Sequence, residues 1–289
     1  MNFLYITNSI APNVINSMYT LKEKDQNKQS LYNSNLKRAG AGIEDSLELL
    51  RNWNDDLSSL EMRKKLVLDN VLGKKSYRRR KDFLDFIFYP RYINAYPNGH
   101  WKYLQQLEKS GISTEVMKQL LYFYTALNEP FIPLFINKYI LPRFSEGILE
   151  VTYDGTKDFL RNAISDGTVN VKWTTNVLSG VASGLLNALA GFGILQGKVK
   201  RSIAPSLIQL PIFYFIAFFI QQEGFSGEKL VKHKYWNLFL LNDVEKKHLF
   251  FEAHLQKYLW YEEIGHIYKI EFKEKTFEEV TDVIIKRTT

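Results

Sequence analysis

The stretch VKWTTNVLSGVASGLLNALAGFGILQGKVKR, residues 171–201, decides to which class of protein this chain belongs. Its uncharged part, residues 173–196, has the length of a membrane span, and Gly180 and Gly184 form the GxxxG pattern found where membrane helices pair. Seven of these 24 residues carry polar side chains, however, so the segment is less apolar than a span requires. The pattern therefore favours a helix outside the membrane.

The same stretch is typical of a helix followed by a β-hairpin, the last two parts of a winged helix-turn-helix. Thr174 or Thr175 can cap a helix that runs over residues 176–189, and a hairpin over residues 194–203 follows it. Cations flank both ends of the helix, where they could reach phosphates. The alternative is a purely structural helix and hairpin with incidental surface lysines. The candidate DNA contacts of this unit are Lys172, Thr174, Thr175, Asn176, Lys198, Lys200 and Arg201.

The residues before this stretch complete the predicted unit. Residues 148–153 (ILEVTY) alternate as in a strand, Asp154-Gly155 is expected to turn the chain, and residues 156–164 form a short helix. After the hairpin, residues 206–221 are strongly apolar but too short for a span, which predicts a buried core helix. The N-terminus shows no basic n-region of a signal peptide and the chain has no Cys, so we expect a cytoplasmic protein without membrane insertion.

Charge points to a second candidate site a hundred residues earlier. The chain has a formal net charge of +7, and residues 61–81 hold nine basic and two acidic residues, which equals the whole excess. A concentrated basic segment is the expected mark of a protein that binds the phosphate backbone of nucleic acid. The alternative is a solvated helix face that binds nothing.

This basic segment also has the outline of a helix-turn-helix. Ser58 and Glu61 form a capping box that starts a helix running to about Leu72, and Gly73 suits the residue beyond its end. Ser76 can cap a second helix, which Pro90 is expected to limit. Cations in its first turns oppose the helix dipole, which an incoming anion would explain. The candidate DNA contacts here are Lys74, Lys75, Arg78, Arg79, Arg80 and Lys81.

The remaining sequence predicts a mainly α fold, a helical bundle with winged-helix and helix-turn-helix-like elements and a few short strands. We expect a flexible N-terminal extension over residues 1–38, with packed structure beginning at Ala39, and a helical domain over residues 39–147. Residues 148–289 form a C-terminal domain whose winged-helix-like element covers residues 148–205. Its remainder is expected to be helical over 240–261, strand-like over 266–272 and helical from Phe277.

The sequence lacks the motifs of the common enzyme classes. It contains no Walker loop, no GxGxxG, no HExxH and no GxSxG. His248 and His254 are six residues apart, which places them on different faces of a helix and argues against a shared metal. We therefore expect no enzymatic activity, no metal and no cofactor.

Several stretches together resemble the BrxA family of the BREX bacteriophage-defence systems, formerly described as inner-membrane proteins. They are AGAGIEDSLELLRNW (39–53), RKKLVLDNVLGKKSYRRRK (63–81), YFYTALNEPF (122–131), DFLRNAISDG (158–167) and TTNVLSGVASGLLNALAGFGIL (174–195), with the basic hairpin after it. The resemblance spans roughly residues 39–220. It implies a mainly helical, cytosolic protein that binds double-stranded DNA, works with other BREX proteins in phage resistance and has no catalytic activity of its own.

Residues and resemblance together predict a non-enzymatic DNA-binding accessory protein of an antiviral defence system, held on duplex DNA mainly by phosphate contacts. Two alternatives remain: a scaffold that binds protein partners through its aromatic-rich C-terminal third, and an RNA-binding helical protein.

Overall fold

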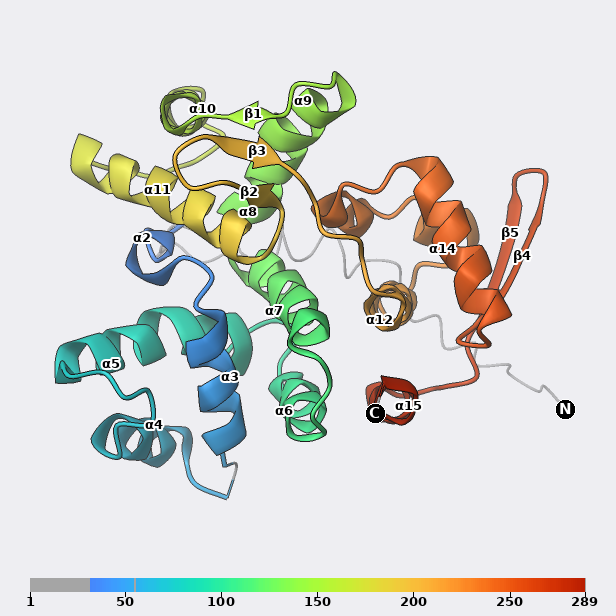
Figure 1. Ribbon diagram of the computed structural model, residues 1–289, viewed down its shortest axis with the longest axis horizontal. Coiled ribbons are helices and arrows are strands. Elements are labelled where there is room, and N and C mark those ends of the chain that lie inside the picture. The colour runs from blue at the N-terminus through green and yellow to red at the C-terminus, as the bar shows by residue number, and fades with distance from the viewer. Residues whose placement is uncertain (1–31, 55, 289) are drawn as a thin grey trace, which may run out of the picture.

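The computed structural model describes residues 32–54 and 56–288, and these form a mainly helical protein (Figure 1). The first half contains α2 (Leu36–Ala39), α3 (Ile43–Asn52), α4 (Ser59–Leu68), α5 (Tyr77–Phe83), the π-helix η1 (Leu84–Ile93), α6 (Trp101–Lys109), α7 (Thr114–Asn128), α8 (Phe131–Phe135), the π-helix η2 (Ile136–Ile140) and α9 (Leu141–Ser145). The second half contains β1 (Glu150–Val151), α10 (Tyr153–Ser165), α11 (Thr175–Gly191), β2 (Leu195–Gln196), β3 (Arg201–Ile203), α12 (Leu210–Gln222), α13 (Gly227–Val231), the 3-10 helix η3 (Lys234–Phe239), α14 (Asp243–Leu255), β4 (Trp260–Ile264), β5 (Ile267–Glu271) and α15 (Phe277–Thr288). The predicted fold class is confirmed.

The two helices of the basic segment, α4 and α5, begin where the sequence predicted, but they do not end where it predicted. Ser58 and Glu61 form both hydrogen bonds of the predicted capping box, and the Ser76 hydroxyl accepts from the backbone N–H of Arg79 at 3.4 Å. The prediction that α4 reaches Leu72 is wrong, because Asn70 already adopts a left-handed conformation (φ 51°). An asparagine tolerates that conformation better than most residues, which allows the earlier end.

Pro90 does not limit the second helix of this pair. The helix continues past it as η1, and the backbone N–H of Asn94 donates to the carbonyl of Tyr89, five residues back, at 2.8 Å. Proline cannot donate a backbone hydrogen bond, and the wider π-helical turns absorb that loss without ending the helix. The expected stop at Pro90 is therefore wrong, and the π-helical segment brings Arg91 into the protein interior, where it is fully buried.

Helix α12 confirms the predicted core helix. Nine consecutive residues, Ile212 to Ile220, are buried, and α7, α13, α14 and α15 pack around it. No helix of residues 32–54 and 56–288 is both long and apolar enough to cross a membrane. Apolar side chains on all faces of a helix indicate burial among neighbouring helices, which is what α12 shows.

The C-terminal part contains one strand that the sequence did not indicate. β5 and α15 lie where they were predicted, but β4, with the sequence WYEEI, replaces the end of the expected long helix. β4 and β5 pair antiparallel, with Tyr261 opposite Ile270 on the buried side of the hairpin. Two glutamates in five residues obscured the alternation of buried and exposed side chains in β4.

A half-buried histidine joins the two halves of the core. The His100 ring contacts those of Tyr124, Phe219 and Phe277, which come from α7, α12 and α15, and its Nδ1 lies 2.7 Å from the Tyr124 hydroxyl oxygen. Burial lowers the pKa of His100 to about 4. Burial also lowers the pKa of His233 to about 4, beside Phe225 and Tyr235.

These two histidines predict a loss of stability in mild acid. The unfolded chain takes up their protons near its ordinary histidine pKa of about 6.5, whereas the folded protein resists until about pH 4, so stability falls as the pH drops through this window. The melting temperature should therefore fall by several degrees between pH 7 and pH 5. In a His100→Gln variant the melting temperature should change less over the same pH range. A melting temperature of the wild-type protein that stays constant over that range contradicts the prediction.

Candidate nucleic-acid interface

One compact unit carries the stretch from 148 to 203. β1, α10, α11, β2 and β3 follow one another, and the three strands form an antiparallel sheet in the order β1-β3-β2 (Figure 1). Val151 lies opposite Arg201, and Gln196 opposite Ser202. The predicted turn at Asp154-Gly155 is wrong: Thr152 caps α10 by accepting from the backbone N–H of Gly155, so both residues lie in the first helical turn. A capping threonine needs its following residues in helical conformation, and the strand is correspondingly short.

Helix α11 buries one face and leaves the opposite face open. Val181, Leu185 and Ala188 are fully buried, whereas Asn176 and Ser183 are exposed. Thr174 is the cap, because its hydroxyl accepts from the backbone N–H of Val177 at 3.4 Å. Lys172 and Thr175 are exposed at the same end of the helix. The exposed positions 176, 183 and 187 are seven and four residues apart, which aligns them along one stripe, here named the open face of α11.

The loop between β2 and β3 borders this open face on one side. Gly197 turns the chain with φ 88°, and a Cβ atom there would lie 2.1 Å from the carbonyl oxygen of Lys200, so only glycine fits. Lys198, Val199 and Lys200 are exposed at the tip. Arg201 is half-buried, and burial lowers its pKa. Its guanidinium donates to the Asn187 side-chain oxygen at 2.6 Å and to the carbonyl of Gly197 at 3.3 Å, which ties the loop to α11.

Residues 36–41 border the open face on the other side. Gly180 and Gly184 form the floor on which α2 packs, and a Cβ atom on Gly184 would lie 2.1 Å from the carbonyl oxygen of Leu36. The GxxxG pattern therefore allows a close backbone contact within this chain. Packed structure begins before Ala39, contrary to the prediction, because Leu36 is fully buried and lies in α2. Residues 1–31 lie outside the described residues.

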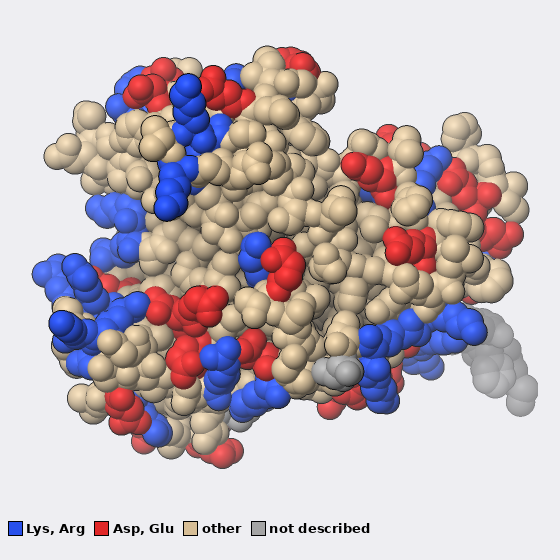
Figure 2. Space-filling model, in the orientation of Figure 1, with Lys and Arg blue, Asp and Glu red and all other residues tan. Residues whose placement is uncertain are grey.

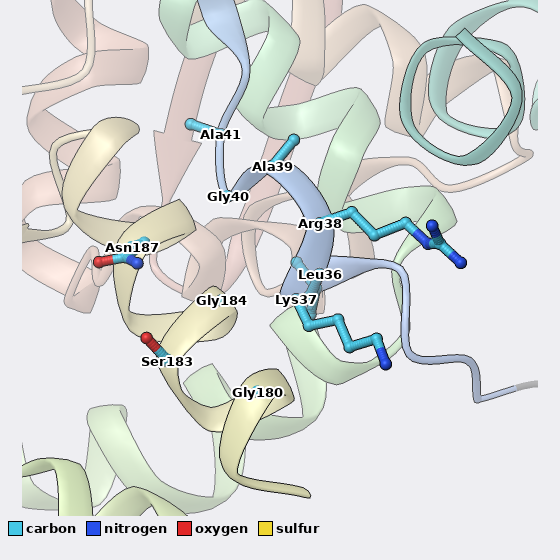
Figure 3. A pocket seen from close by; sticks show the side chains of 10 residues that line it. All are labelled: Leu36, Lys37, Arg38, Ala39, Gly40, Ala41, Gly180, Ser183, Gly184 and Asn187. Carbon is cyan, nitrogen blue, oxygen red and sulfur yellow. The ribbon is translucent and has the colours of Figure 1, made fainter. Parts of the chain in front are cut away.

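Two surface hollows meet at the open face. One, of about 340 Å³, lies between residues 36–41 and α11 (Figure 3), and the other, of about 190 Å³, lies between α11 and the β2–β3 loop. Ser183 and Asn187 line both. The open face is therefore a ridge between two grooves, with Lys37 beside one groove and Lys198 beside the other.

The basic segment around α5 is more neutralised than its sequence suggested. Lys74 pairs with Asp45 at 2.6 Å, Lys81 with Asp85 at 2.6 Å, and Arg78 contacts Asp82 at 3.8 Å. Arg80 is half-buried with its guanidinium 5.8 Å from the centre of the Tyr77 ring, and its Nε is buried without a hydrogen-bond partner. Lys75 and Arg79 are exposed, and among the described residues neither has a carboxylate within ion-pair distance. The charge count that stopped at Lys81 left out Asp82 and Asp85, which lie one helical turn further on.

Helix α2 connects the two basic regions that the sequence treated separately. Arg38 lies over the Phe86 ring at 4.0 Å and its Nη1 is 3.3 Å from the Asp82 carboxylate, which places α2 against α5. Lys37 and Arg38 are both exposed between α5 and α11. Figure 2 shows Lys and Arg side chains along the side of the molecule where α5, α2 and the β2–β3 loop lie. Sequence reasoning missed these two cations, because a four-residue helix has no periodicity and its neighbours are polar; only Leu36 beside them hinted at packing.

The sequence model of the BrxA family matches residues 30–218 of this chain, from just before α2 into α12. The match includes α5, α2, α11 and the β2–β3 loop, and so covers the whole basic surface. No curated protein matches the chain. Since the match covers well over half of the sequence, the chain belongs to the BrxA family of BREX bacteriophage-defence components.

Proposed function

We propose that this protein is a cytoplasmic, non-enzymatic accessory protein of its defence system. It binds double-stranded DNA and does not modify it chemically. The unit from β1 to β3 acts as a winged helix: α11 is the helix that faces the DNA and the β2–β3 loop is the wing. Phosphate contacts come from the wing, from α2 and from the first turns of α5.

One observation carries the proposal: cations from two separate parts of the chain border one uncharged, exposed helix face, and a third group lies beside one of them. Lys198 and Lys200 in the wing and Lys37 and Arg38 in α2 lie on its two sides, and Lys75, Arg78 and Arg79 at the start of α5 lie beyond α2. A helix that enters a groove needs small polar groups toward the bases and cations toward the phosphates on either side. The strand order β1-β3-β2 supports the assignment, because it lets the loop between β2 and β3 extend beside α11.

Salt dependence tests the phosphate contacts. If about six phosphates are engaged, the affinity for duplex DNA should fall roughly a thousandfold between 50 and 200 mM salt. Changing Arg78 and Arg79 together to alanine should weaken binding to all sequences alike and make the salt slope shallower by about two, because two counterion-releasing contacts are lost. Fluorescence anisotropy with labelled duplexes of unrelated sequence measures both quantities.

A matched charge control separates a local contact from the loss of net charge. Lys273 and Lys275 are exposed cations between β5 and α15 in the C-terminal part, and changing both to alanine removes the same charge. That variant should keep the wild-type salt slope. If its slope changes as much as that of the Arg78 and Arg79 variant, or if the wild-type affinity does not respond to salt, the interface proposed above is wrong.

A scaffold function has separate support from the C-terminal part. Val244, Phe251 and Leu255 of α14 leave 77%, 53% and 62% of their surface exposed, and Trp260 at the start of β4 leaves 51% exposed. Such exposed apolar side chains are typical of surfaces that bind proteins. Co-purification with other BREX proteins and no retention on DNA would favour the scaffold, and competition between duplex DNA and duplex RNA distinguishes DNA binding from RNA binding.

A further inference from the structure

The side chain of Asn187 is held in one orientation at the C-terminal end of the open face. Its oxygen accepts from Nη2 of Arg201 at 2.6 Å. A guanidinium only donates hydrogen bonds, so the atom of Asn187 that faces it must be the oxygen and not the nitrogen. Arg201 in turn is fixed by the carbonyl of Gly197, which ties the orientation of the amide to the position of the wing.

The amide nitrogen of Asn187 is consequently available as a donor. In Figure 3 the oxygen points away from residues 36–41, and the nitrogen lies on the side of the groove next to them. Asn187 is exposed and lines both grooves, and no described residue accepts a hydrogen bond from its nitrogen. Among residues 32–54 and 56–288, none fixes Asn176 or Ser183 in a comparable way, so Asn187 is the pre-oriented polar group of the ridge.

We infer that Asn187 reads one base in the major groove by donating to its acceptor edge, with Arg201 as the residue that positions it; this inference rests on the proposed function. An unrestrained asparagine recognises adenine by accepting from N6 while donating to N7. The bond from Arg201 uses one of the two lone pairs of the Asn187 oxygen and fixes the amide nitrogen as the donor, which favours a base that presents acceptors to it. Guanine presents two adjacent acceptors, N7 and O6, thymine presents one, O4, beside its methyl group, and cytosine presents a donor.

The experiment selects bound sequences from duplexes randomised over about two helical turns, roughly 20 base pairs, followed by sequencing. The wild-type protein should prefer guanine over cytosine at one position by about fivefold or more. Asn187→Asp keeps the bond to Arg201 but replaces the donor with an acceptor, so the preference at that position should change to cytosine. Asn187→Ala should lose the preference there and keep the salt slope, which a merely structural role would not produce.

A control variant that adds the same negative charge as Asn187→Asp, together with the wild-type protein, completes the test. Asn162 is an exposed residue of α10, and Asn162→Asp introduces the same negative charge away from the open face; it should weaken binding slightly and still select guanine. Wild-type protein that binds duplexes without any base preference, or an Asn187→Asp variant that still selects guanine, overturns the inference and leaves the proposed function standing. Wild-type protein that binds no duplex overturns the proposed function itself.

Discussion

Replacing Arg91 with methionine is expected to lower the free energy of unfolding by about 3–5 kcal/mol, the cost of leaving a buried charge without its partner. Arg91 is fully buried, and its Nε donates to Glu129 at 3.1 Å. Its Nη1 donates to the carbonyls of Gly40 and Ala41 at 2.9 and 3.2 Å, so one side chain holds the turn that follows α2. Burial raises the pKa of Glu129, and Arg91 counteracts that shift. Chemical denaturation followed by circular dichroism measures the loss.

An exposed ion pair provides the matched control. Lys65 pairs with Asp69 at 2.8 Å, with more than half of the lysine side chain exposed. Lys65→Met should cost less than about 1 kcal/mol, because solvent already screens this pair. If the two methionine variants lose similar stability, the Arg91 guanidinium does not carry the role assigned to it.

Alanine at Gly184 is expected to weaken both stability and DNA binding, although alanine is normally the better helix former. The added methyl group would lie 2.1 Å from the carbonyl oxygen and 2.4 Å from the carbonyl carbon of Leu36, which are backbone atoms that cannot rotate away. We expect a loss of about 1–3 kcal/mol, as for an overpacked core. Displacing α2 also displaces Lys37 and Arg38, so the affinity for duplex DNA should fall together with the melting temperature.

Gly180 in the same helix provides the comparison. A Cβ atom there would meet only the Lys37 side chain, with its Cβ at 3.3 Å, and a flexible side chain can yield. Gly180→Ala should therefore leave stability unchanged or raise it by up to about 1 kcal/mol, the ordinary helix propensity difference. Equal effects of the two alanines on stability and binding would show that the close approach of α2 to α11 is unimportant.

Local signals predicted the elements of the candidate interface well. The caps at Ser58, Ser76 and Thr174 lie where the sequence placed them, because a capping hydroxyl acts on backbone groups three residues away. The helix over residues 176–189 and the hairpin after it also lie where they were predicted. These features depend on neighbours within one or two turns of the chain, and their sequence patterns are correspondingly direct.

The arrangement of the interface could not be predicted, because it depends on contacts between distant residues. Arg38 and Asp82 are 44 positions apart, and Arg201 and Asn187 are 14 positions apart, in different elements. The number of basic residues over 61–81 was correct, but it overstated how many of them are unpaired. Asp45, for example, neutralises Lys74 from a separate helix. Polarity alone assigned α2 to a flexible extension, while its only deeply buried side chain, Leu36, decides its place.

Helix α12 bears on how the chain can be divided. The family match ends at residue 218, within the run of buried residues from Ile212 to Ile220. The helices that pack around this run include α13, α14 and α15, all of which lie beyond the match. A chain shortened to the matched region would expose phenylalanine rings to water on several sides and invite aggregation. The C-terminal part thus covers a core that it shares with the matched region, and shortened forms are unsuitable for testing the proposed DNA binding.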